Sequence, residues 1–253
     1  MITWIAFAKT MGGKDSALRI PFVTEPEFLG RAHVTADHMA GLSETELMDL
    51  LKVSAQIACR TSEQYQMISR GEAEILPALA AYTGAVFRRI APSGFEKGDW
   101  LFAQDHLRIM SSLYGILRPL DGISAYRLEA TASLDGQNTV AASWRPLLTE
   151  SFISLVKDSG GVLLDLASEE MRLFLDWNAV MSSVRVVRPD FYERRSGRLK
   201  SVTMYAKMCR GEMVRHVVLN RIDSPEELAG FSWDGFSYDP SVSTGDHMVF
   251  VRG

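Results

Sequence analysis

HLRIMSSLYGILRPLDGISAYRLE, residues 106–129, is the most informative stretch of this chain. Ionisable side chains stand among apolar and turn residues throughout it, at His106, Arg108, Arg118, Asp121, Arg127 and Glu129. Because charges are costly to bury without partners, such a mixture is typical of the wall of a polar site. The alternative is a surface loop held by ion pairs, and the residues alone leave both interpretations open.

Part of this stretch resembles a known family. SSLYGILRPLDGISAYRLE, residues 111–129, is similar to the central signature of the YaaA family of bacterial peroxide stress proteins. Further similar pieces occur in the family's order over nearly the whole chain, at Phe7–Met11, Ala81–Ile90, Leu163–Met171 and Tyr205–Val218. The chain is identified as a diverged member, because Ala6-Phe7 replaces the usual Ser-Pro, Asp165 replaces Asn and Met171 replaces Tyr.

Composition places the chain among ordinary globular proteins. Its 253 residues are 47% hydrophobic and 23% charged, enough for one large domain or two small ones. No apolar run approaches the roughly 20 residues that span a bilayer, and no basic residue precedes the short apolar start. We therefore expect neither a membrane span nor a signal peptide. Cys59 and Cys209 form no metal or redox spacing, which fits a cytoplasmic protein.

The order of the expected elements predicts an α+β protein. Apolar runs predict strands over 1–8, 162–166 and 248–251, and a hairpin of 184–192 with 199–204. Helical spacing and cap signals predict helices over 26–39, 44–59, 98–107, 144–156, 205–220 and 225–229. Since strands and helices alternate without a regular βαβ repeat, we expect one compact domain over 1–253 with a mixed central sheet. The resemblance implies the same, an elongated cantaloupe fold with a basic cleft.

Several helix ends carry cap signals. Thr24, Ser43 and Ser224 each stand three residues before a glutamate, which is the spacing of a capping box. Ser168 is expected to cap the helix after the strand over 162–166. Pro146 is expected in the first turn of its helix, where a missing N–H is tolerated.

Positive charge is concentrated in residues 181–221, the basic segment. This segment holds ten Lys and Arg against three acids, although the whole chain has a net charge of −4. Such segregation focuses an electric field on an anionic ligand. The alternative is a solvated hairpin and helix face.

Several cations are candidates for binding an anion. Lys9 ends the first expected strand beside Gly12 and Gly13, where a backbone can approach a ligand, or it is an ordinary exposed lysine. Lys207 and Arg210 lie three apart on one helix face, so either an anion lies between them or each pairs with an acid such as Asp121 or Glu129. The resemblance favours one basic cleft, and the candidate ligand-binding residues are Lys9, Arg118, Arg127, Ser168, Lys207 and Arg210.

Asp121, Tyr126 and Glu129 are the candidate groups for moving protons. The alternative is that the acids, together with Asp165, neutralise neighbouring arginines. The sequence contains no nucleophile-elbow motif, and its five histidines lack zinc-like spacing. We therefore expect no metal and no cofactor.

One turn has the outline of a DNA-binding motif. Residues 40–43, Ala-Gly-Leu-Ser, join two expected helices as in a helix-hairpin-helix, which binds the DNA backbone through N–H groups. The resemblance implies such a motif, whereas the flanking acids Asp37, Glu44 and Glu46 favour ordinary helix packing. If DNA binds, the basic segment must supply the charge.

Two functions follow as hypotheses. The first is a peroxide-stress protein that binds double-stranded or distorted DNA non-specifically, with a link to limiting iron-driven oxidative damage that only the resemblance implies. The second is a diverged enzyme, in a biosynthetic pathway, that acts on a small anionic ligand, a nucleotide or a carboxylate. An enclosed pocket with both cations and acids favours the enzyme, and an open groove lined only by cations favours DNA. A protein-interaction module would instead expose a large apolar patch.

Overall fold

Strand β1, Ile2–Ala6, lies in the middle of the central sheet of the computed structural model, which describes residues 1–12 and 18–253. Its residues are almost all buried, as the apolar run at the start of the chain predicts for a strand between two neighbours. Strands β3 and β6 pair with it in parallel on its two sides. Gly13, expected in the turn after this strand, lies outside the described residues.

The central sheet combines parallel and antiparallel strands. Within the described residues its order is β4-β3-β1-β6-β7-β11-β10-β9, and β8 pairs with β7. The strands from β3 to β11 in this order run parallel, while β4, β8, β9 and β10 join by antiparallel pairing. Their bounds are β3 Leu107–Ser111, β4 Gly115–Leu117, β6 Val162–Asp165, β7 Arg185–Arg195, β8 Arg198–Lys200, β9 Ser232–Trp233, β10 Phe236–Tyr238 and β11 His247–Arg252. A separate small pair joins β2, Leu76–Pro77, to β5, Gly122–Ile123.

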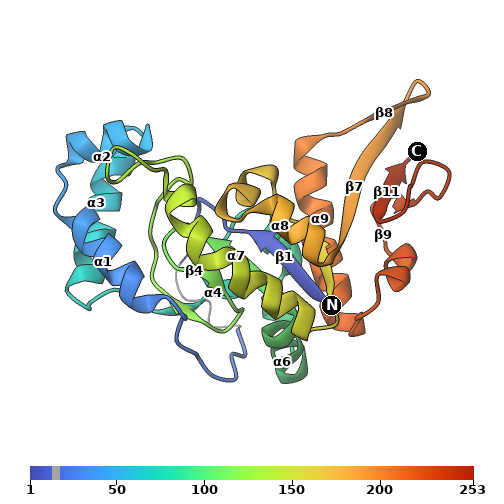
Figure 1. Ribbon diagram of the computed structural model, residues 1–253, viewed down its shortest axis with the longest axis horizontal. Coiled ribbons are helices and arrows are strands. Elements are labelled where there is room, and N and C mark those ends of the chain that lie inside the picture. Colours follow the sequence, from blue (N-terminus) through green and yellow to red (C-terminus); the bar gives the residue numbers. More distant parts are fainter. Residues whose placement is uncertain (13–17) are drawn as a thin grey trace.

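Helices flank this sheet, so the expected fold class is confirmed (Figure 1). Their bounds are α1 Leu29–Ala40, α2 Glu44–Leu51, α3 Ala55–Ser69, α4 Ala78–Ala81, α5 Ala85–Ile90, α6 Lys97–His106, α7 Val140–Asp158, α8 Trp177–Ser183 and α9 Thr203–Asn220. In Figure 1, α1, α2 and α3 gather at one end of the long axis, and β7, β8 and β11 lie towards the other. Over residues 1–12 and 18–253, no helix is both long enough and apolar enough to cross a bilayer.

Local signals predicted several elements correctly. The helices expected over 98–107 and 205–220 match α6 and α9 to within two residues. The hairpin is formed by β7 and β8, whose turn at Ser196-Gly197 has positive φ at both residues, 49° and 74°. Its second strand was expected to reach residue 204 but ends at Lys200, because α9 already begins at Thr203. Ser43 forms the predicted capping box with Glu46, since each side chain bonds the other residue's backbone N–H.

Three predicted caps are wrong. The Thr24 hydroxyl donates to Asp121 instead, and α1 begins only at Leu29 without a side-chain cap. The Ser224 hydroxyl bonds the Glu226 carboxylate, and the segment that follows is 3₁₀ rather than α-helical. Ser168 makes no side-chain cap bond before its own 3₁₀ segment. For Thr24 and Ser224, another acceptor competes with the helix backbone for the hydroxyl.

Two predicted helices have wrong limits. The helix expected over 44–59 is two helices, because Lys52 adopts a left-handed conformation with φ of 54° and ends α2. The second of these, α3, continues to Ser69. The helix expected over 144–156 begins at Val140, where Thr139 accepts a bond from the N–H of Ala142. Pro146 therefore lies beyond the first turn, where it costs one helical hydrogen bond.

Helices α5 and α9 meet at Gly211. A Cβ atom there would lie 2.2 Å from the carbonyl oxygen of Val86 and 2.7 Å from Cβ of Arg89. Only glycine permits so close an approach. Because Lys207 and Arg210 stand within the preceding turn of α9, this contact also fixes their position.

Replacing Gly211 with alanine is expected to lower the free energy of unfolding by about 1–3 kcal/mol, since the added methyl forces α9 away from α5. Urea unfolding measures the change. Gly230→Ala is the matched control, because a Cβ at Gly230 meets nothing within 4 Å. Equal stability of the two variants would contradict the packing argument.

Candidate functional site

The carboxyl ends of β1 and β6 form a crevice near the middle of the sheet. The chain passes from β1 to its neighbour β3 on one side, and from β6 to its neighbour β7 on the other. Neighbouring parallel strands whose connections leave in opposite directions open a crevice, and open α/β sheets bind ligands there. The sequence did not predict this crevice, because no local sequence pattern reveals the order of strands in a sheet.

A pocket of about 400 Å³, the switch-point pocket, lies in this crevice. Its lining comes from Ala6–Thr10 after β1, Gly84–Phe87 at the start of α5, Leu166, Ser168, Glu170 and Met171 after β6, and Lys207 and Arg210 on α9. Four of the predicted ligand-binding residues therefore meet here, namely Lys9, Ser168, Lys207 and Arg210. In the described ranges, no three His, Cys, Asp or Glu side chains gather as metal ligands do.

Lys207 and Arg210 form no ion pair within the described part of the chain. The acids considered as their partners are bonded elsewhere, Asp121 to Arg118 and Glu129 to Lys9 and Arg127. Burial lowers the pKa of Arg210, although nearby carboxylates oppose the shift, and a guanidinium remains protonated at neutral pH. Its Nε is buried and meets no acceptor among the described residues. The pocket thus contains positive charge that no acid neutralises directly.

Glu129 connects the signature to the pocket. Its carboxylate lies 2.5 Å from Nζ of Lys9, and its other oxygen accepts from Nη2 of Arg127 at 2.9 Å. The Glu129 side chain is 11% exposed, so both bonds are partly shielded from water. Lys9 is therefore held in place rather than free, and Arg127 and Glu129 stand directly behind it.

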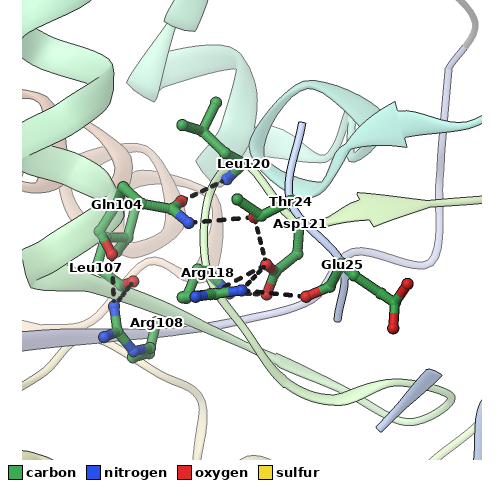
Figure 2. Close-up of polar contacts among 8 residues, drawn as sticks. All are labelled: Thr24, Glu25, Gln104, Leu107, Arg108, Arg118, Leu120 and Asp121. Carbon is green, nitrogen blue, oxygen red and sulfur yellow. Dashed lines mark hydrogen bonds and ion pairs between the residues drawn. The ribbon is translucent and has the colours of Figure 1, made fainter. Parts of the chain in front are cut away.

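Asp121 and Arg118 line a different hollow from the switch-point pocket. Figure 2 shows the Asp121 carboxylate accepting from the Thr24 hydroxyl at 2.7 Å and from Nε and Nη2 of Arg118 at 3.0 and 2.8 Å. Gln104 extends this network by donating to Thr24 and accepting from the N–H of Leu120. Asp121 is 1% exposed, and its oxygens accept hydrogen bonds from Thr24 and Arg118.

Tyr126 lies behind the pocket wall. Its hydroxyl bonds those of Ser111 at 2.8 Å and Tyr82 at 3.0 Å. Burial raises the pKa of both tyrosines, so their hydroxyls stay protonated at neutral pH. The Tyr82 ring packs 5.0 Å from Phe87, which lines the pocket. Tyr126 therefore supports the wall through Tyr82.

Asp165 anchors the loop that follows β6. Its carboxylate accepts from Nη2 of Arg172 at 2.8 Å and from the N–H of Ala167 at 3.1 Å. Burial raises the pKa of Asp165, and Arg172 opposes that shift. The Arg172 guanidinium lies over Trp177, which stacks on Trp4 of β1. These contacts fix the loop that lines the pocket.

Ion pairs neutralise much of the charge of the basic segment, with acids both inside the segment and elsewhere in the chain. The ion pairs are Arg185 with Glu226 and Asp246, Arg188 with Glu169 and Asp190, Arg194 with Asp239, Arg195 with Glu193, and Arg221 with Asp99. Arg215 donates to the carbonyls of Ile90 and Ala91. Within the described residues, some cations of this segment form neither an ion pair nor a hydrogen bond to a backbone carbonyl. They are Arg198, Lys200, Lys207 and Arg210.

The turn considered as a helix-hairpin-helix joins α1 to α2 at one end of the molecule. The basic segment lies over β7, β8 and α9, away from that turn along the long axis (Figure 1). The turn and the basic segment therefore do not form one continuous surface.

The chain is similar to known proteins over its whole length. A family model described as peroxide stress protein YaaA matches residues 1–242. A UPF0246 protein of Bacteroides thetaiotaomicron is 44% identical over 255 residues, covering 100% of this chain and 99% of that protein. UPF0246 proteins of Porphyromonas gingivalis and Clostridium perfringens are 37% and 34% identical, and each comparison covers at least 99% of both chains.

Asp121→Asn is expected to lower the free energy of unfolding by about 2 kcal/mol, because hydrogen bonds to a buried charge are lost. Urea unfolding measures this loss. Asp49→Asn, which changes an exposed carboxylate, is the control and should leave stability within about 0.5 kcal/mol of the wild type. An Asp121→Asn protein as stable as the control would show that the network in Figure 2 does not hold the fold together.

Proposed function

The chain belongs to the family of the peroxide stress protein YaaA, and from this premise we propose that it serves peroxide defence by binding a small anion in the switch-point pocket. The anion is a nucleotide or a carboxylate. One observation carries the proposal, namely that Lys207 and Arg210 line the pocket without an ion pair in the described residues. Two cations three residues apart on a helix repel each other, and an anion between them removes that repulsion.

The chemistry of the lining favours a small ligand over DNA. Glu170 belongs to the lining, and Glu129 stands behind Lys9, so acids accompany the cations. A DNA phosphate backbone would meet repulsion from these carboxylates. Of the candidate proton-transfer groups, Glu129 is the one bonded to a lining residue, and we propose it as the acid or base of any reaction in the pocket. Tyr126 and Asp121 take supporting roles.

Non-specific DNA binding is a second candidate, and the β7–β8 hairpin favours it. This hairpin projects at one end of the molecule (Figure 1), and Arg198 and Lys200 near its tip are exposed and form no ion pair in the described residues. Cations on a projecting arm can approach a duplex backbone and release its counterions. DNA covered in this way would be shielded from iron-driven oxidative damage.

Anion binding is expected to raise the thermal unfolding midpoint of the wild-type protein at about 150 mM salt, because a ligand that binds only the folded state stabilises it. The probes are inorganic phosphate, nucleotides and small carboxylates. Lys207→Ala and Arg210→Ala should abolish the rise. Arg198→Ala, which removes the same charge outside the pocket, should retain it. A rise that persists in both pocket variants would refute the proposed site.

Duplex binding is expected to weaken steeply between about 50 and 200 mM salt and to be lost in the Arg198→Ala, Lys200→Ala double variant. Fluorescence anisotropy with a short duplex measures the affinity, and nicking of plasmid DNA by Fe²⁺ and peroxide measures protection. Lys207→Ala serves as the control and should bind the duplex normally. Absence of binding at low salt would exclude this candidate.

A further inference from the structure

We propose that the ligand of the switch-point pocket is an aromatic organic phosphate of the nucleoside monophosphate type. Its phosphate lies on Lys207 and Arg210, its sugar hydroxyls face Glu170, and its base packs on the apolar wall beside Phe7. This inference rests on the proposed function and narrows the class of anion.

Polar and apolar groups enter the pocket from different elements. Helix α9 contributes only the two cations, whereas α5 contributes only Gly84 and apolar residues. Phe87 is 2% exposed and packs on Tyr82, so this part of the wall is rigid. Phe7, in the segment that follows β1, is half-buried. A ligand that fits both elements has an anionic end and a flat apolar body, since aromatic faces bind bases by stacking.

The size of the pocket also requires a body beyond the anion. Its volume of about 400 Å³ falls within the range of about 300–1,000 Å³ found for organic ligands. Phosphate or acetate alone would contact the cations and leave the apolar wall in water. Burial of that wall is favourable in proportion to its area, so a ligand with an apolar body gains affinity there.

The charges match a monophosphate. Lys9 is already bonded to Glu129, which leaves Lys207 and Arg210 as the lining cations without an ion pair in the described residues. A phosphomonoester carries about −1.5 to −2 near pH 7 and presents three acceptor oxygens. Arg210 offers planar guanidinium donors that suit phosphate.

Glu170 distinguishes a nucleotide from a simpler aromatic phosphate. Its carboxylate is exposed in the lining and accepts hydrogen bonds but donates none. Sugar hydroxyls are donors that such a carboxylate can bind, as acids do beside the crevice of other doubly wound sheets. A second phosphate at this position would be repelled, which disfavours di- and triphosphates.

Isothermal titration with AMP, adenosine, ribose 5-phosphate and inorganic phosphate tests the inference. AMP is expected to bind at least about tenfold more tightly than each of the others, because only AMP has both the base and the phosphate. Ribose 5-phosphate or inorganic phosphate binding as tightly as AMP would overturn this inference and leave the proposed anion site intact. Failure of every anion to bind would refute both.

Variants locate the two ends of the ligand. Phe7→Ala is expected to weaken AMP about tenfold and to leave the affinity for inorganic phosphate unchanged, whereas Lys207→Ala should weaken both. Phe22→Ala removes an aromatic ring that is 45% exposed outside the lining, and it should change neither affinity. Glu170→Gln should weaken AMP and leave inorganic phosphate binding at least as strong. Unchanged AMP affinity in Phe7→Ala would overturn the placement of the base.

Discussion

The parallel pairing of β1 with β3 on one side and β6 on the other is the constraint on which the site depends. Trp4 of β1 is in register with Arg108 of β3 and Asp165 of β6, so residues from three distant parts of the chain share one row of the sheet. Because the connections of β1 and β6 lead to opposite sides, no crossover among residues 1–12 and 18–253 covers their carboxyl ends. The segments after these strands therefore remain available to line a pocket, and α5 and α9 close it from outside the sheet.

Charge in the sequence and charge at the surface differ in this protein. Residues 181–221 are strongly basic in the amino-acid sequence. In the folded protein, acids as far away in the chain as Asp99 and Asp246 neutralise some of their arginines. What remains is concentrated at the hairpin tip and on the α9 face that lines the pocket. Arg210 in the pocket is partly buried, so water and salt screen its charge less than those of the exposed Arg198 and Lys200 at the hairpin tip, whereas Lys207 is exposed as they are. The remaining cations therefore differ in how strongly salt screens them.

Elements that depend on residues close to one another in the sequence were predictable. β1, α6 and α9 follow from apolar runs and helical spacing, and the Ser43 cap follows from a partner three residues away. Thr24 has the same local signal, yet its partner Asp121 is 97 residues away, and no local pattern reveals that competition. The position of α5 depends likewise on packing against α9, which is distant in the sequence. The resemblance indicated Lys9, Lys207 and Arg210, but only strand order shows why they meet.

The central signature supports the pocket from behind. Tyr126 backs the wall through Tyr82, and Glu129 holds Lys9, while Asp121 ties Thr24 to the turn at Arg118. These bonds are made within the protein, so they explain how the signature positions the lining and do not indicate which ligand the pocket takes.

Two departures from the pattern that the resemblance implies lie in the lining of the switch-point pocket. They are Phe7, in place of the proline of that pattern, and Met171, in place of its tyrosine. The first adds a ring beside the crevice, and the second replaces a hydroxyl-bearing ring by a flexible thioether that can pack against an apolar ligand. Both changes make the wall more apolar without altering Lys9, Lys207 or Arg210. For the proposed ligand, these changes bear on the apolar body and leave the contacts of its anionic end with Lys207 and Arg210 as they are.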